Sequence, residues 1–110
     1  MSEDYAIWDI DRILEAYEGV PEWQANVEKG FNSLFCFLER NGLVMCGVTN
    51  ARGEVVRRLI MASDLTEEGK LLALGPRNPI DRWLDSNGRK KNPPDMKILE
   101  RALAKVRAKK

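Results

Sequence analysis

The chain has no histidine, only two cysteines and no long run of apolar residues. The missing histidine removes the most frequent general base and metal ligand, and with it every Ser-His or Cys-His nucleophile. No stretch of about eighteen apolar residues is present to span a membrane. The chain opens with Met1-Ser2-Glu3-Asp4, whereas a secretory signal opens with positive charge. We therefore expect a cytoplasmic protein that is not an enzyme and has no metal or cofactor.

The two cysteines, Cys36 and Cys46, allow two interpretations. They can form a disulfide, or they can serve as small buried hydrophobes among Phe35, Phe37 and Met45. A reducing compartment and these apolar neighbours favour the second interpretation. A length of 110 residues, with 44% hydrophobic and 32% charged residues, is typical of one folded domain.

Charge is distributed unevenly along the chain. Residues 1–42 contain three basic and nine acidic residues, residues 43–69 contain three and four, and residues 70–110 contain twelve and four. The three segments therefore carry net charges of −6, −1 and +8. This polarity indicates either a basic tail that seeks an anion or two ends that attract each other. Ordinary solvated helix faces explain it equally well.

Two amphipathic helices are predicted at the ends of the chain, over residues 4–18 and from residue 95 onward. Each has an apolar seam with spacings of three, four and three residues. The seams consist of Ile7, Ile10, Leu14 and Tyr17 in the first helix and of Met96, Leu99, Leu103 and Val106 in the last. They pair either between two subunits or within one, because so many apolar side chains cannot remain in water.

The middle of the chain predicts shorter elements. A helical turn over residues 23–27 is followed by Gly30, and a helix over residues 32–41 starts at the cap Asn32. Two strand-like runs, residues 43–49 and 54–61, flank an asparagine-led turn and predict a β-hairpin. A helix then begins near Asp64, with the Thr66 hydroxyl as its cap, and another begins with Asn78 as its cap. A linker spans residues 86–94. The fold class is therefore mostly α with one β-hairpin.

Part of this middle region resembles a known family. The segments Phe37-Leu38-Glu39-Arg40-Asn41-Gly42-Leu43-Val44 and Leu65-Thr66-Glu67-Glu68-Gly69-Lys70-Leu71-Leu72 flank the hairpin, whose tip is Arg52-Gly53. Together they resemble the winged-helix domains of MarR-like and PadR-like bacterial regulators over about residues 31–74. The resemblance implies a winged helix-turn-helix with extra N- and C-terminal helices. It divides the chain into a winged-helix-like domain, residues 1–88, and a basic linker with the last helix, residues 89–110.

The resemblance also implies functional residues. In that family the helix before the wing enters the DNA major groove, wing arginines contact the backbone or minor groove, and the flanking helices form a homodimer. The reading face would be Asn32, Ser33, Cys36 and Arg40, and the wing cations would be Arg52, Arg57 and Arg58. An edge strand also needs charge to prevent pairing with other chains, which is a structural explanation for the same arginines.

Two further groups of side chains have a binding and a structural interpretation. The tail contains Arg89, Lys90, Lys91, Lys97, Arg101, Lys105, Arg107, Lys109 and Lys110. It can bind nucleic acid by counterion release, serve as a solubilising tail, or be neutralised by the acidic first helix. The three tryptophans, Trp8, Trp23 and Trp83, can stack on bases, but their apolar neighbours favour core packing or a protein interface.

The first functional hypothesis is therefore a small homodimeric transcriptional regulator that binds double-stranded DNA. The second is a protein-interaction module, such as an immunity protein or antitoxin-type inhibitor, whose acidic N-terminal half docks on a basic partner. A hydrolase built on carboxylates is the third.

Overall fold

The computed structural model describes residues 5–52, 54–91 and 94–108. Two short strands and five α-helices follow the order β1 (Ala6–Asp9), α1 (Ile10–Glu15), α2 (Pro21–Arg40), β2 (Leu59–Met61), the 3-10 turn η1 (Ala62–Asp64), α3 (Glu67–Ala73), α4 (Pro79–Leu84) and α5 (Lys97–Ala108). The expected mostly helical chain is confirmed, and its two-stranded antiparallel sheet pairs β1 with β2. None of the described helices has the length and apolar character needed to cross a membrane.

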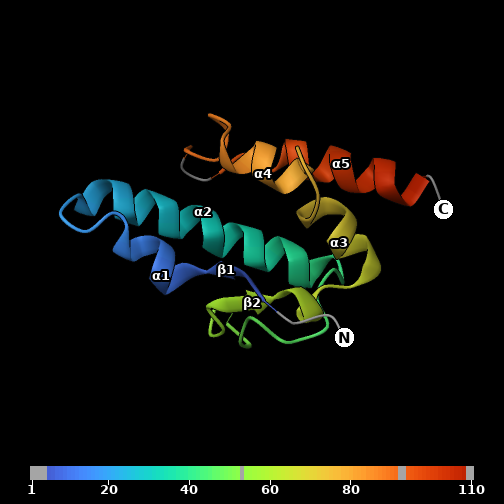
Figure 1. Ribbon diagram of the computed structural model, residues 1–110, viewed down its shortest axis with the longest axis horizontal. Helices are drawn as coiled ribbons and strands as arrows, with labels where there is room; N and C mark the ends of the chain where they lie inside the picture. The colour runs from blue at the N-terminus through green and yellow to red at the C-terminus, as the bar shows by residue number, and fades with distance from the viewer. Residues whose placement is uncertain (1–4, 53, 92–93, 109–110) are drawn as a thin grey trace.

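Helix α2 is the spine of the molecule. It runs across the middle of Figure 1, with α1 and the two strands on one side and α4 and α5 on the other. Its buried residues come from more than one face: Val27, Gly30, Phe31, Leu34, Phe35, Phe37 and Leu38. A helix buried between two layers needs apolar residues on both sides, and this one has them.

The expected break at Gly30 is wrong, since α2 continues through it for 20 residues. The side chain of Arg89 crosses the helix at this point. A Cβ on residue 30 would lie 3.2–3.3 Å from the Cγ, Cδ and Nη1 atoms of Arg89. Glycine therefore lets the Arg89 side chain pass close to the helix, although it costs about 1 kcal/mol relative to alanine in a helix. The separate helical turn and the helix over residues 32–41 are one element.

The first predicted helix is also corrected at its start. Residues 6–9 form β1, and helix α1 begins only at Ile10, with Asp9 as its N-cap. Strand β1 pairs antiparallel with β2, with Trp8 opposite Ile60 and Asp9 opposite Leu59. Trp8 is 5% exposed and its ring centroid lies 6.2 Å from that of Phe35 on α2. Ile7 therefore belongs to a strand, although its spacing from Ile10 fits a helix.

The hairpin turn occurs where it was expected, but its strands do not pair along their length. The Asn50 side chain accepts hydrogen bonds from the N–H groups of Arg52 and Glu54, and an isolated bridge joins Thr49 to Val55. Beyond the bridge the two arms separate. Leu43, Val44 and Met45 bond to residues 64–66, at the start of α3, while β2 pairs with β1. A single hairpin over residues 43–61 is thus a wrong prediction for the outer parts of both strands.

Both predicted apolar seams pack into one core within the chain. Ile10 and Leu14 of α1 and Leu99 and Leu103 of α5 are buried, and the remaining four members, Ile7, Tyr17, Met96 and Val106, are partly buried against the same cluster. Gly69 of α3 allows close packing in this core, because a Cβ there would collide with the carbonyl oxygen of Leu43. The structure thus places the seams inside one subunit.

Candidate interaction surfaces

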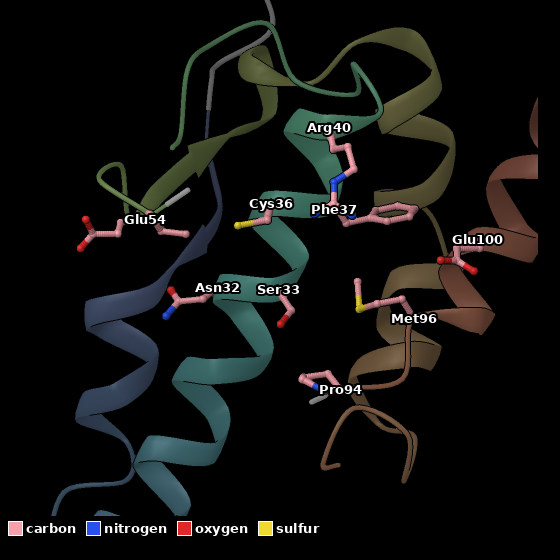
Figure 2. Close-up of a pocket in the computed structure, with 10 residues that line it drawn as sticks. Asn32, Ser33, Cys36, Phe37, Arg40, Glu54, Pro94, Met96 and Glu100 are labelled. Atoms are coloured by element: carbon pink, nitrogen blue, oxygen red, sulfur yellow. The ribbon is translucent and has the colours of Figure 1, made fainter. Parts of the chain in front are cut away.

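The predicted reading face lies on the floor of a groove. Asn32, Ser33, Cys36 and Arg40 line a cavity of about 610 Å³ together with Phe37. Figure 2 shows these residues on α2, with the hairpin residue Glu54 on one side and Pro94, Met96 and Glu100 on the other. The face of α2 that the resemblance assigns to DNA is therefore recessed between two walls of the same chain.

The hairpin wall is held in place by Glu39, a residue that the sequence analysis did not single out. Its carboxylate accepts hydrogen bonds from the backbone N–H of Val48 at 2.8 Å, the N–H of Thr49 at 3.3 Å and the Thr49 hydroxyl. The Thr49 hydroxyl bond, followed by the Val48 bond, lowers the pKa of Glu39 below its ordinary value of 4.5. Glu39 is half-buried, and a glutamate between Leu38 and Arg40 on a helix has no sequence feature that predicts this role.

The floor of the groove has one buried acceptor with no partner. Among the described residues, Oδ1 of Asn32 is the buried side-chain polar atom with no hydrogen-bond partner. Such an atom costs about 1–3 kcal/mol relative to a paired one, and native structures contain few of them. Asn32 lies within α2 and does not cap it, because the helix starts at Pro21.

The cysteines lack the features of a reactive site. No disulfide joins Cys36 to Cys46, and both side chains are partly buried. Burial raises the pKa of both thiols, and at Cys46 the nearby Asp64 raises it further. Both thiols are therefore protonated near neutral pH, a state in which they are poor nucleophiles.

Two of the three wing arginines are joined to carboxylates. Arg57 binds Asp64 at 2.7 Å and the carbonyl of Leu59 at 3.0 Å. Arg58 binds Asp11 of α1 at 2.8 Å and Glu28 of α2 at 3.2 Å.

Burial of Arg58 opposes its charge, but the hydrogen bonds to the two carboxylates outweigh this effect and raise its pKa. Arg52, at the turn, is exposed. The structure thus leaves one wing cation at the surface and places the other two in ion pairs.

The basic triplet after α4 does not form one patch either. Arg89 is 6% exposed, and its guanidinium donates to the carbonyl of Leu84 at 2.6 Å and to Oδ1 of Asn26 at 3.3 Å. Arg89 and Lys90 both lie over the ring of Trp23, at 5.9 and 5.5 Å from its centroid. Lys91 is exposed. The segment that follows α4 lies on the opposite side of α2 from the hairpin (Figure 1).

The third tryptophan, Trp83, belongs to the hydrophobic core. Trp83 is completely buried and donates from its ring nitrogen to the carbonyl of Asp95 at 2.7 Å, so it joins Trp8 in the core.

In the described part of the tail, Arg107 pairs with Glu68 at 3.4 Å, while Lys97, Arg101 and Lys105 are exposed along α5. Lys109 and Lys110 lie outside the described residues. Helix α1 lies on the far side of α2 from α5 (Figure 1), but its residue Ile13 lines a pocket with Arg89 and Lys90. Neutralisation of the tail by the first helix stays a prediction.

No protein-family model, curated protein or solved structure matches the chain. Among the residues that the structure describes, no three His, Cys, Asp or Glu side chains gather in the way that metal ligands do. Two surfaces are candidates for binding: the groove over α2 and the face of α5 on which Lys97, Arg101 and Lys105 are exposed.

The Glu39 contact predicts a pH-dependent stability. Replacement by glutamine (Glu39→Gln) removes the charge that the Val48 and Thr49 donors stabilise, so it should lower the free energy of unfolding at pH 7. Because the pKa of Glu39 is depressed in the folded state, its contribution is fully present above about pH 4.5 and is lost as the pH falls through the folded-state value. Urea unfolding of both proteins between pH 7 and pH 3 measures this difference.

The difference between the two unfolding curves should shrink as the pH falls below 4.5. The variant Glu15→Gln, which removes an exposed carboxylate of α1, is the matched control and should behave as the parent. A Glu39→Gln difference that stays constant down to pH 3 would contradict this role.

Proposed function

We propose that this chain is a protein-interaction module, and that the groove over α2 binds a polypeptide segment carrying positive charge. One observation carries the proposal: the outer face of α2 is the floor of a cavity of about 610 Å³ and not a ridge. A helix that reads DNA must project into the major groove, which is about 12 Å wide. A recessed face fits a segment that projects from a partner.

The groove offers both apolar and acidic side chains, which suits a peptide that contains apolar and basic residues. Phe37, Val55 and Met96 offer apolar contacts, and the exposed carboxylates of Glu54 and Glu100 stand on opposite walls. A basic segment that crosses the groove would meet one carboxylate at each wall. Charge at the rim of an interface mainly accelerates and orients association, whereas the apolar floor supplies affinity.

The charged residues that line the groove are Glu54, Glu100 and Arg40, so their net charge is −1. The segment that includes α1 and α2 carries the −6 charge, in which Arg12, Lys29 and Arg40 are the only cations. This charge agrees with the second functional hypothesis, in which the acidic N-terminal half meets a basic partner. An immunity protein or antitoxin-type inhibitor is one class of protein with this property.

The use of Arg57 and Arg58 is a second support for the proposal. Each already donates to a carboxylate, and Asp11, Glu28 and Asp64 would repel a phosphate that approached these guanidinium groups. Phosphate contacts supply most of the non-specific affinity for DNA. Arg57 and Arg58, two of the cations that DNA binding would use, therefore stabilise the fold through ion pairs.

Selection from a displayed library of random 12-residue peptides tests the proposal. We expect the selected peptides to be enriched in lysine and arginine. The double variant Glu54→Lys/Glu100→Lys should weaken their binding by about tenfold or more, because two attractive charges become repulsive. The matched control Glu15→Lys reverses an exposed carboxylate outside the groove and should leave binding unchanged.

The unpaired Oδ1 of Asn32 provides a second readout. In Asn32→Leu, peptide binding should weaken while the free energy of unfolding stays the same or rises by up to about 1 kcal/mol, since a buried orphan acceptor is removed. The proposal is wrong if no peptide is enriched, or if the selected peptides bind both groove variants as tightly as the parent.

A winged-helix nucleic-acid-binding protein is the second candidate, and the order of elements favours it. Helices α1 and α2 are joined by a short turn containing Gly19, and α2 is followed by the bridged hairpin, β2 and α3. Arg52 is exposed at the hairpin turn, and further cations are exposed on α5. The homodimer expected for this class stays a prediction. It would need another surface, because the seam residues lie in the core.

Random 20-base-pair duplex DNA distinguishes the two candidates. As a protein-interaction module, the chain should show no binding in 50 mM salt in a fluorescence anisotropy titration. Micromolar binding with a steep inverse salt dependence, weakened by Arg52→Ala, would favour the regulator. Arg57→Ala and Arg58→Ala are unsuitable probes, since both variants also remove ion pairs of the fold.

A further inference from the structure

A second groove lies between α4 and α5, away from the one over α2. It has a volume of about 470 Å³, and its floor is formed mainly by the apolar side chains of Pro79, Ile98, Ala102 and Val106. Ile98 is 41% exposed. Leu99 and Leu103 of the predicted α5 seam face the core, whereas Val106, another member of that seam, belongs to an apolar stripe that lines this groove. Ile98, Ala102 and Val106 recur every four residues and form the stripe along one side of the helix.

Three cations surround this floor. Arg82 comes from α4, and Arg101 and Lys105 come from α5, where they are spaced one turn apart. All three residues are exposed, and the ion pairs of the described residues do not involve them. Like charges four residues apart on a helix repel each other by a few tenths of a kcal/mol. An anionic partner would relieve this repulsion.

We infer that the groove between α4 and α5 is a docking site for an acidic amphipathic helix of another protein. An apolar stripe on such a helix would cover Ile98 and its neighbours, and carboxylates beside the stripe would reach Arg82, Arg101 and Lys105. This is the helix-in-groove mode of recognition, in which residues spaced three or four apart serve as anchors. The charge of this groove is opposite to that of Glu54 and Glu100 at the α2 groove, whose proposed partner is basic.

The shape and the polarity favour a helix over other anions. Duplex DNA presents charged phosphates, which gain nothing from an apolar floor. A lipid surface is flat or convex and takes an exposed amphipathic face, whereas here the apolar residues lie in a concavity between two helices. The inference does not depend on the function proposed for the groove over α2, since no residue lines both grooves.

A library of 16-residue helical peptides tests the inference. Each peptide carries leucine at positions spaced three and four apart, and the flanking positions vary among glutamate, glutamine and lysine. Selection on the parent protein should enrich glutamate at the flanks. The affinity of a selected peptide should fall about tenfold or more in Arg101→Glu/Lys105→Glu and in Ile98→Asp. Lys91→Glu, an exposed cation outside the groove, is the matched control and should leave affinity unchanged.

Thermal unfolding of each variant separates a folding defect from a loss of binding, and the double variant should melt as the parent because both its positions are exposed. The inference is overturned if no peptide is enriched, if the enriched flanks are basic, or if affinity is the same in the double variant. It is also overturned if anionic vesicles, duplex DNA or a second copy of the chain binds in place of peptides and loses binding in the same variants.

Discussion

Arg58 connects three parts of the chain that are distant in sequence. It stands at the end of the hairpin, binds Asp11 at 2.8 Å on α1 and binds Glu28 at 3.2 Å on α2. Its backbone carbonyl accepts from the N–H of Ile10, where β1 passes into α1. These contacts fix the hairpin against the layer formed by β1, α1 and α2. The positions of both walls of the α2 groove depend on such contacts, since Glu39 holds the hairpin and Arg89 and the buried residues of α5 hold the other side.

The charges of the chain therefore divide into structural and available ones. Arg57, Arg58 and Arg89 are bound to acceptors of the fold, and a cation used in this way is a poor candidate for phosphate contact. The two grooves differ in charge, with Glu54, Glu100 and Arg40 at the α2 groove and Arg82, Arg101 and Lys105 at the groove between α4 and α5. Opposite charge on two surfaces is suited to two partners or to two parts of one partner.

The sequence predicts the features that local patterns determine. The caps Thr66 and Asn78, the asparagine-led turn and the buried faces of α1 and α5 occur as predicted. It fails where long-range contacts decide the structure. Strand β1 exists because it pairs with β2, about fifty residues later, and Ile7 fits a helical spacing by coincidence. Gly30 reads as a helix end because nothing near it indicates that Arg89 passes over it. The groove was missed because its walls come from residues 54–55 and 94–100, which only the tertiary fold brings to α2.

The central claim is that Arg58 serves the fold, and replacement of Arg58 by methionine, with the exposed Arg52 as the control position, tests it most directly. Methionine keeps the apolar part of the side chain and removes the charge. In urea unfolding, Arg58→Met should lower the free energy of unfolding by about 1–2 kcal/mol because the contacts to Asp11 and Glu28 are lost. Arg52→Met, at the exposed turn, should change it by less than about 0.5 kcal/mol. Equal stability of the two variants would show that Arg58 is available for binding and would contradict the account.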